Sequence, residues 1–174
     1  RIDVDELGEC PVTEILCVVP PFSYGKLDSV GPKCPNLGLG IIAAVIEKLG
    51  YDVKILDCFG LELTEGDAAK ELEKHNPKIV LLGSSTANFR IAMSILKKAK
   101  EFNPSVINII GGPHVTVNPG SAFKEEGVVD YVVINEAEET IVELLNHIYK
   151  KSDVPLSEIK GIMYLDGENK VRTA

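Results

Sequence analysis

Two short segments carry the residue types best suited to hold a ligand, and each directly follows an apolar run. Residues 83–86 read Gly-Ser-Ser-Thr and offer hydroxyls and backbone N–H groups ahead of a predicted helix. That arrangement suits an amide or phosphate oxygen, or a simple helix cap. Residues 111–114 read Gly-Gly-Pro-His, and paired glycines let a ligand approach the backbone or permit positive φ. We expect residues 115–119 to stay extended beside them.

His114 has the chemistry of a metal ligand or general base, but no second histidine lies near it in the sequence. A loop histidine without such a partner more often makes hydrogen bonds in the wall of a site. None of the four cysteines lies two or three residues from another, which excludes zinc-knuckle, redox CxxC and iron–sulfur motifs. We therefore predict no catalytic residue and no metal ligand in this chain.

The common nucleotide-binding motifs are missing. No GxGxxG string follows the first apolar run and no GxxxxGK[ST] string occurs, which argues against a dinucleotide or nucleoside-triphosphate site. A phosphorylated receiver domain would need an acidic pair after the first run and an aspartate ending the third. Pro20-Pro21 and Gly83-Ser84 stand in those places.

The elements that must position these segments alternate between apolar runs and helix-period stretches. The predicted strands are 15–19, 53–57, 79–83, 106–110 and 131–134. The predicted helices are 36–49, 64–75, 88–102, 120–126 and 138–149, with Asn36 and Thr64 as caps. Residues 162–172 are expected to form a small β-hairpin.

Apolar runs without alternation indicate strands buried on both faces, as in a parallel sheet covered by helices on each side. We predict an α/β fold with a doubly wound, flavodoxin-like or Rossmann-like, five-stranded parallel sheet and a C-terminal hairpin. The expected organisation is an N-terminal extension at 1–14, the domain at 15–151 and a ribbon or linker at 152–174. In such sheets the ligand binds beyond the carboxyl ends of the strands, where both polar segments lie.

Composition narrows the class further. The 174 residues are 45% hydrophobic, which is ordinary for a globular chain and unlike a disordered one. The net charge of −8 argues against a nucleic-acid partner, which needs a basic face for phosphates. The sequence holds no apolar stretch long enough to cross a membrane and no signal peptide, so we expect a cytoplasmic location with reduced thiols.

The order of several short motifs resembles one family, the N-terminal cobalamin-binding domain of cobalamin-dependent radical S-adenosylmethionine enzymes. Each motif is weak alone, and the resemblance depends on eight of them in order across residues 15–172. The motifs are Val19-Pro20-Pro21, Asn36-Leu37-Gly38-Leu39, Gly50-Tyr51-Asp52-Val53, Leu56-Asp57, Gly83-Ser84-Ser85-Thr86, Gly111-Gly112-Pro113-His114-Val115-Thr116, Val129-Asp130-Tyr131-Val132-Val133 and Glu136-Ala137-Glu138-Glu139-Thr140.

The resemblance implies a cobalamin that lies across the strand ends, with its nucleotide tail between the sheet and a helix. Ser84, Ser85 and Thr86 would meet the corrin ring or the tail. Residues 111–114 would line the tail pocket, and 135–138 would form the remaining wall. The cofactor-binding residues implied are Pro21, Ser84, Ser85, Thr86, Gly111, Gly112, Pro113, His114, Asn135, Glu136 and Glu138.

Two departures from related patterns affect this reading. The DxHxxG string of methionine-synthase-type domains does not occur, so the resemblance implies no histidine below cobalt. The family often has Gly-Glu-Gly-Glu after the fifth strand, where this chain has Asn135, Glu136, Ala137 and Glu138. The added side chains predict altered or weakened cobalamin binding.

The resemblance also implies a parent enzyme, most simply a methyltransferase. Relatives continue into a radical S-adenosylmethionine barrel with a CxxxCxxC motif for a [4Fe–4S] cluster; neither that cofactor pair nor that motif belongs to this chain. The barrel, in the same parent chain, is the expected partner. Two alternatives stay open: a stand-alone interaction or regulatory domain that has lost cobalamin, and a flavodoxin-like FMN protein.

Overall fold

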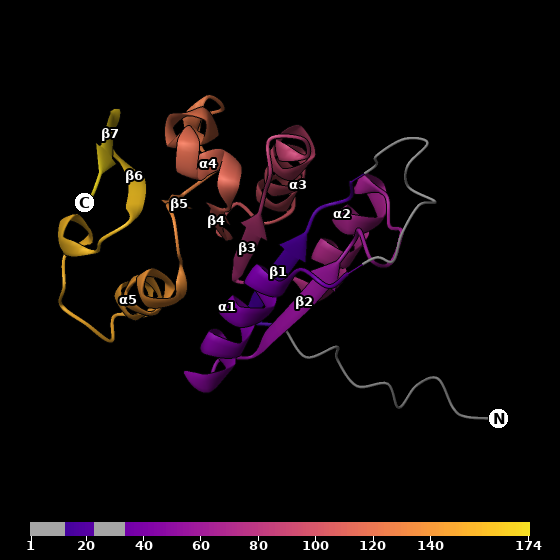
Figure 1. The fold of residues 1–174 in the computed structure, drawn as a ribbon, viewed down its shortest axis with the longest axis horizontal. Helices are drawn as coiled ribbons and strands as arrows, with labels where there is room; N and C mark the ends of the chain where they lie inside the picture. Colours follow the sequence, from indigo (N-terminus) through magenta and orange to yellow (C-terminus); the bar gives the residue numbers. More distant parts are fainter. Residues whose placement is uncertain (1–12, 23–33) are drawn as a thin grey trace.

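The computed structural model describes residues 13–22 and 34–174, so most of the expected extension at 1–14 lies outside the described residues. One mixed sheet runs through the molecule in the order β2-β1-β3-β4-β5-β6-β7 (Figure 1). The first five strands are parallel, and the last two are antiparallel to their neighbours. The strands are β1 (Ile15–Val19), β2 (Val53–Asp57), β3 (Ile79–Gly83), β4 (Ile107–Gly111), β5 (Tyr131–Val133), β6 (Ile162–Asp166) and β7 (Asn169–Arg172).

The predicted α/β class, the five parallel strands and the C-terminal hairpin are confirmed, but the predicted count of five strands in the sheet is wrong. The pairing of Val133 with Ile162 and of Tyr131 with Tyr164 joins the hairpin to the edge of the sheet, which therefore has seven strands. The β5 edge would otherwise expose unpaired N–H and C=O groups. The order β2-β1-β3-β4-β5 is the flavodoxin-like arrangement, whose connections change face between β1 and β3.

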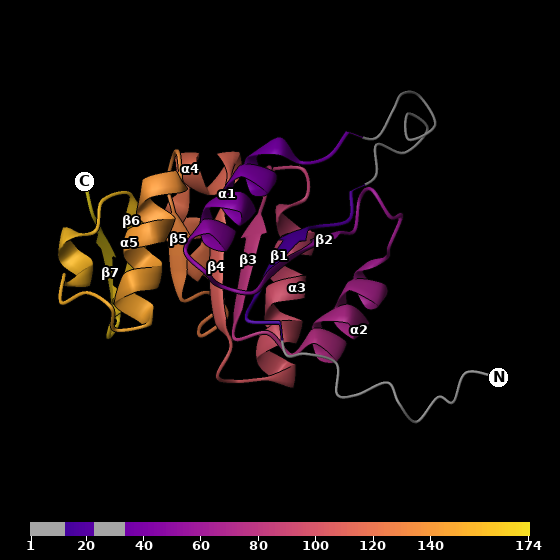
Figure 2. The same cartoon turned by 90° about the horizontal axis from the view of Figure 1, so that it is seen from below.

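Helices cover both faces of the sheet and give two apolar cores. Helices α1 (Leu37–Lys48) and α5 (Glu138–Ile148) pack on one face, where Figure 2 shows them in front of the sheet. On the other face lie α2 (Glu65–His75), α3 (Phe89–Phe102), α4 (Pro113–Val117) and the 3₁₀ helix η3 (Pro119–Phe123). The short η4 (Leu156–Glu158) precedes β6. Successive strand residues alternate between the two cores because side chains alternate across a strand.

Local sequence explains where the helices begin. The Asn36 side chain accepts from the N–H of Leu39 at 2.9 Å, as its predicted capping role requires. Thr64 and Asp67 form a reciprocal capping box at α2. In the part of the chain that the structure describes, no helix is long and apolar enough to span a membrane.

The segment after β4 differs from the prediction. Residues 113–117 form the short helix α4 instead of an extended wall, and the helix expected at 120–126 is the 3₁₀ turn η3. Pro113 fixes a φ suited to a first helical turn and offsets the strand preference of the β-branched residues that follow. The helical turn also buries Val115 completely against the sheet.

A buried polar side chain ties β4 to the elements above it. Asn108 is fully buried, and its amide nitrogen donates to the carbonyls of Leu96 at 2.8 Å and Val128 at 2.7 Å. Its backbone N–H donates to Asp130, whose carboxylate is 2.8 Å from the Lys100 ammonium. These bonds hold the loop before β5 against α3 and so position β5, the last of the parallel strands.

Candidate ligand site at the carboxyl edge of the sheet

Two glycines leave a slot on one face of the sheet at its carboxyl edge. Gly83 ends β3, Gly111 ends β4, and the two are paired in register. Both fall on the α1 and α5 face, because Leu81 and Ile109, two residues earlier, belong to that core. A Cβ added to Gly83 would meet nothing within 4 Å, and one added to Gly111 would meet only Val133, at 3.6 Å or more. At this edge, therefore, neither strand places a side chain between the sheet and these helices.

Ser84, which directly follows Gly83, places an unsatisfied polar atom at the same edge of the sheet. The residue is 3% exposed, and its Oγ has no hydrogen-bond partner among the described residues. A buried hydroxyl left without a partner costs on the order of 1–3 kcal/mol, so such atoms usually await a ligand or a water. Ser84 is thus the described residue that most directly indicates a polar group bound at this edge.

Gly112 serves the internal packing of the chain and not the approach of a ligand. Its φ is +100°, and an added Cβ would lie 2.6 Å from the carbonyl oxygen and 2.9 Å from the nitrogen of Ser84. The N–H of His114 donates to the same Ser84 carbonyl at 3.3 Å. The two glycines of residues 111–112 therefore differ: Gly111 borders open space, whereas Gly112 lets the loops after β3 and β4 touch.

The loop after β3 and the start of α4 are joined by a cluster around His114. Its Nδ1 is 3.1 Å from the hydroxyl of Thr86, and its Nε2 is 3.2 Å from that of Ser121. The imidazole stacks on the Phe89 ring, with centroids 3.9 Å apart. Thr86 is exposed on the rim of the site, while Ser121 is buried behind it. Pro113, at the first turn of α4, is exposed as well.

Ser85 belongs to the local structure of the same loop. Its backbone N–H and its hydroxyl both donate to the Asn88 side chain, at 2.8 and 3.1 Å. Asn88 is the N-cap residue of α3, but its side chain makes no capping bond to that helix. The loop 84–88 is therefore closed by hydrogen bonds within itself, with Thr86 at its exposed side.

The loop after β5 supplies the remaining side of the edge. Asn135 has a left-handed φ of +64°, and its N–H donates to the Thr116 hydroxyl at 3.0 Å. Asn135 and Glu136 are exposed, and Ala137 is the N-cap of α5. Glu138 is half-buried in the first turn of α5, where a carboxylate is favoured by the helix dipole.

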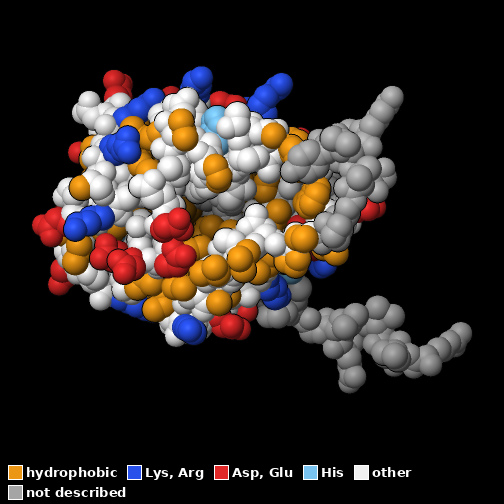
Figure 3. All heavy atoms as spheres, in the orientation of Figure 1, with side chains coloured by type: hydrophobic (Ala, Val, Ile, Leu, Met, Phe, Trp, Pro, Cys, Tyr) orange, Lys and Arg blue, Asp and Glu red, His pale blue; other side chains and the backbone are white. Residues whose placement is uncertain are grey.

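The molecular surface is hollowed between these elements. Figure 3, in the orientation of Figure 1, shows a hollow with hydrophobic side chains at its floor, between the side of α1 and α5 and the side of α3 and α4. Leu37 at the start of α1 is 76% exposed and Val117 at the end of α4 is 87% exposed. Pro21 is half-buried after β1, just before residues 23–33, which are outside the described ranges.

Sequence reasoning did not single out every residue that the structure brings to this edge. Gly83 was predicted to end the strand 79–83 but was not included among the cofactor-binding residues, whereas its pairing with Gly111 makes it half of the slot. Ser121 and Thr116 lie beyond the segment predicted to bind and reach the site because α4 turns the chain back. A signal for Gly83 existed, since it is the last residue of an apolar run.

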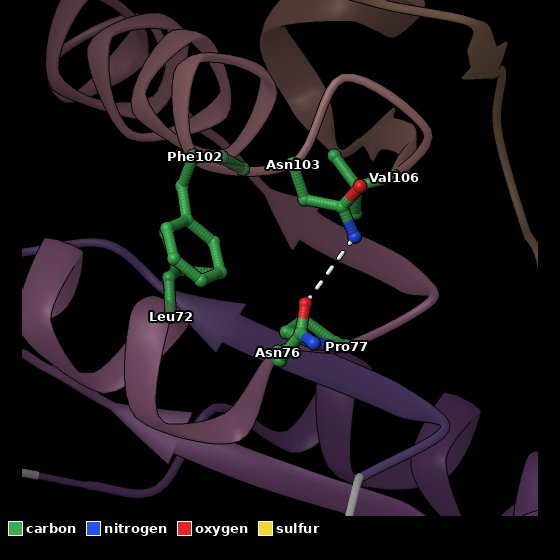
Figure 4. Close-up of a pocket in the computed structure, with 7 residues that line it drawn as sticks. Leu72, Asn76, Pro77, Phe102, Asn103 and Val106 are labelled. Carbon is green, nitrogen blue, oxygen red and sulfur yellow. Dashed lines mark hydrogen bonds between the residues drawn. The ribbon is translucent and has the colours of Figure 1, made fainter.

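A shallow pocket at the opposite edge of the sheet is unrelated to the slot. It is lined by Leu72, Asn76, Pro77, Ala99, Phe102, Asn103 and Val106 (Figure 4). A 3.3 Å hydrogen bond from Asn103 to Asn76 crosses it. Its lining is mostly apolar and it lies where β3 and β4 begin, so it offers little for a polar ligand.

Comparison with known proteins identifies the family. A family model described as B12 binding domain matches residues 26–145. The chain is 36% identical over 154 residues to Uncharacterized methyltransferase PH0819 of Pyrococcus horikoshii, covering 88% of this chain and 32% of that protein. It is 31% identical over 160 residues to Cytidylyl-2-hydroxyethylphosphonate methyltransferase of Streptomyces wedmorensis, covering 81% of this chain and 29% of that protein. The chain thus spans about a third of these relatives.

Two solved structures share the fold. The cobalamin-dependent S-adenosylmethionine radical enzyme OxsB, with aqua-cobalamin and S-adenosylmethionine bound, superposes with a TM-score of 0.75 at 19% identity, covering 94% of this chain and 22% of that chain. The radical S-adenosylmethionine methyltransferase TsrM from Kitasatospora setae superposes with a TM-score of 0.73 at 16% identity, covering 92% of this chain and 30% of that chain. The match of the family model to more than half of the residues confirms the predicted cobalamin-binding domain. The chain belongs to the B12-binding domain family.

Proposed function

We propose that this chain is the cobalamin-binding module of a cobalamin-dependent radical S-adenosylmethionine enzyme, and that the parent enzyme transfers a methyl group. The family match supports cobalamin as the ligand, and the names of two relatives support methyl transfer. Bound cobalamin would supply a cobalt centre able to carry a methyl group from S-adenosylmethionine to an unactivated carbon or a phosphinate. The S-adenosylmethionine and the [4Fe–4S] cluster would belong to a barrel domain of the parent chain, which is the proposed partner.

The slot at Gly83 and Gly111 and the unpaired hydroxyl of Ser84 support this proposal, because both fit the ligand. The slot between the sheet and α1 and α5 leaves room for the nucleotide tail at Gly83 and Gly111. Ser84 Oγ would hydrogen-bond to the tail and so gain the partner that it lacks. Cobalamin is bulky and fringed with amides, so backbone space and neutral hydroxyls suit it better than fixed charges do.

The other expected residues would border the corrin ring. We place Pro21, Ser85, Thr86, Pro113, Asn135, Glu136 and Glu138 there. Gly112 and His114 would not contact the ligand; they would hold the loops after β3 and β4 together. No residue of this chain is proposed to be catalytic or to bind a metal directly. The cytoplasm is the proposed location, and small ligands and the barrel, not nucleic acid or membrane, are the proposed partners.

Retention of cobalamin tests the proposal directly. The purified domain is mixed with hydroxocobalamin, desalted, and its visible spectrum recorded; we expect retained colour with a base-off-like spectrum. Gly83→Leu should abolish retention without unfolding the domain, since the new side chain enters the slot and not the existing core. Gly66→Leu is the matched control, because Gly66 is exposed on α2, on the opposite face of the sheet.

The outcomes separate the competing functions. Complete washout from the wild-type domain would overturn the proposal and favour a stand-alone interaction domain. Yellow protein as isolated would favour FMN, which the flavodoxin-like strand order also accommodates. Equal retention by Gly83→Leu and wild type would show that the slot is not where the ligand binds.

A further inference from the structure

The hydrogen bonds around His114 form a chain with a defined direction. At its buried end, the Ser121 hydroxyl lies 2.6 Å from the carbonyl oxygen of Asn118. A carbonyl oxygen only accepts, so the single hydroxyl proton of Ser121 is committed to that bond. Ser121 Oγ must therefore accept from His114 Nε2, which is 3.2 Å away.

This direction sets the tautomer of a neutral His114. With the ring proton on Nε2, the other nitrogen, Nδ1, can only accept. Its partner at 3.1 Å is the hydroxyl of Thr86, which must donate. Stacking on Phe89 fixes the ring plane that both bonds require. The hydrogen-bond chain thus runs from Thr86 through His114 and Ser121 to Asn118, and each of its protons points towards the Asn118 carbonyl.

Thr86 stands at the exposed end of this series of hydrogen bonds, and the direction of the bonds decides what it can offer a ligand. Thr86 has no other hydrogen-bond partner among the described residues and is exposed in the loop after β3, at the carboxyl edge of the sheet. Because its proton is committed to His114, its oxygen offers only lone pairs to a ligand. We propose that Thr86 is a specificity-determining acceptor for the N–H of a primary carboxamide, and that His114 and Ser121 are the positioning residues that hold it in this state.

This inference rests on the proposed function and names one part of that ligand. The corrin ring of cobalamin carries primary propionamides, whose chains are long enough to reach a rim residue. An amide NH₂ matches the Thr86 oxygen, whereas a carboxylate at the same place would set oxygen lone pairs against oxygen lone pairs. Thr86 therefore selects the amide over the acid.

Nuclear magnetic resonance of the cobalamin-free domain tests the direction of the chain without any ligand. In ¹⁵N spectra of the neutral ring, His114 should carry its proton on Nε2 and accept a hydrogen bond at Nδ1. Thr86→Val should move the Nδ1 resonance and leave Nε2 in place, and Ser121→Ala should do the reverse. A proton on Nδ1, or an Nδ1 resonance that ignores Thr86→Val, would overturn the inference.

Binding of altered corrinoids tests the selectivity. The probes are hydroxocobalamin and its b-, d- and e-monocarboxylic acids, in each of which one propionamide is hydrolysed. The wild-type domain should bind one of the acids about tenfold more weakly than the parent compound, which is the loss of one hydrogen bond. In Thr86→Val that ratio should fall to about one. His114→Leu should lose the selectivity, while His114→Asn, whose amide oxygen can replace Nδ1 as acceptor, should keep it.

The two possible failures are distinguishable. A wild-type domain that binds hydroxocobalamin but treats all three acids alike, or a Thr86→Val variant that keeps the wild-type ratio, overturns this inference alone. A wild-type domain that binds none of the corrinoids overturns the proposed function and the ligand named here with it. Circular dichroism of each variant shows whether it has folded, and Thr86→Val, at an exposed position, should fold normally.

Discussion

Replacing Gly112 by alanine should destabilise the domain far more than the same change at Gly83, although both glycines lie at the same edge of the sheet. At Gly112 the new Cβ would lie 2.6 Å from the Ser84 carbonyl oxygen, in a backbone conformation with φ +100° and ψ 179°. At Gly83 the Cβ would meet nothing within 4 Å, and φ is not positive. The pair therefore separates a glycine required by packing from one that borders empty space.

The magnitude follows from two separate costs. A side chain in the glycine-only region at positive φ and extended ψ costs on the order of 1–3 kcal/mol. Forcing a methyl group against fixed backbone atoms adds about 1–3 kcal/mol, because Ser84 is buried directly after β3 and cannot move freely. Together these predict a loss of about 2–6 kcal/mol from a domain whose whole stability is on the order of 5–15 kcal/mol.

Urea unfolding monitored by circular dichroism measures both effects. We expect the midpoint for Gly112→Ala to fall sharply with an unchanged slope, while Gly83→Ala stays within about 1 kcal/mol of wild type. If Gly112→Ala also stays within about 1 kcal/mol, the contact with Ser84 does not constrain the fold. The argument that the loops after β3 and β4 are held together there would then be wrong.

Three further predictions concern stability and accessibility. Asn108→Leu should lower the free energy of unfolding by about 1–3 kcal/mol, because it removes the two buried hydrogen bonds to the carbonyls of Leu96 and Val128; an unchanged urea midpoint would contradict this. Burial lowers the pKa of His75 from its ordinary value of 6.5, so the folded state resists protonation. Its contribution to stability should be present above pH 6.5 and lost as the pH falls below it, and His75→Gln should flatten that dependence in thermal melts. Burial also raises the pKa of Cys17 to about 12 and that of Cys58 to about 11, so neither should react with iodoacetamide at pH 8 until urea unfolds the chain; mass spectrometry of labelled peptides would reveal early reaction.

The strands and long helices could be predicted because local signals agreed with one another. Runs such as Ile79–Gly83 are apolar throughout, and the structure buries them from both faces. The caps at Asn36 and Thr64 mark the starts of α1 and α2 to within a residue. Propensity, periodicity and capping all indicated the same elements there, and tertiary contacts did not change them.

The misread parts depend on contacts between distant residues. The pairing of β6 with β5 joins Ile162 to Val133 across a helix and a loop, and no local pattern specifies that distance. Residues 115–117 read Val-Thr-Val, which favours a strand, but burying Val115 against the sheet requires a helical turn. Local propensity is a weak guide where one buried side chain decides the backbone.

The sequence predicted the two segments that form the site, but it did not predict the shape of the site. The glycines at 83 and 111 are 28 residues apart, and only the parallel register of β3 with β4 turns them into one slot. Within residues 111–114, the sequence could not assign Gly111 to the ligand side and Gly112 to Ser84, because that depends on which face each backbone presents. The composition was enough to locate the segment, but only the fold shows which of its residues face the ligand and which face the protein.

The loop after β5 shows why a departure from a family pattern must be judged by backbone conformation. Asn135 stands where a glycine was expected, yet its φ is +64°, and asparagine is among the few other residues that adopt this region readily. Its N–H also donates to the Thr116 hydroxyl, which holds the turn in this conformation. Ala137 offers no side-chain cap to α5, and in this it resembles glycine. The physical basis for expecting Asn135 and Ala137 to weaken cobalamin binding is therefore small, because the Asn135 side chain is exposed and its backbone adopts a conformation that glycine favours.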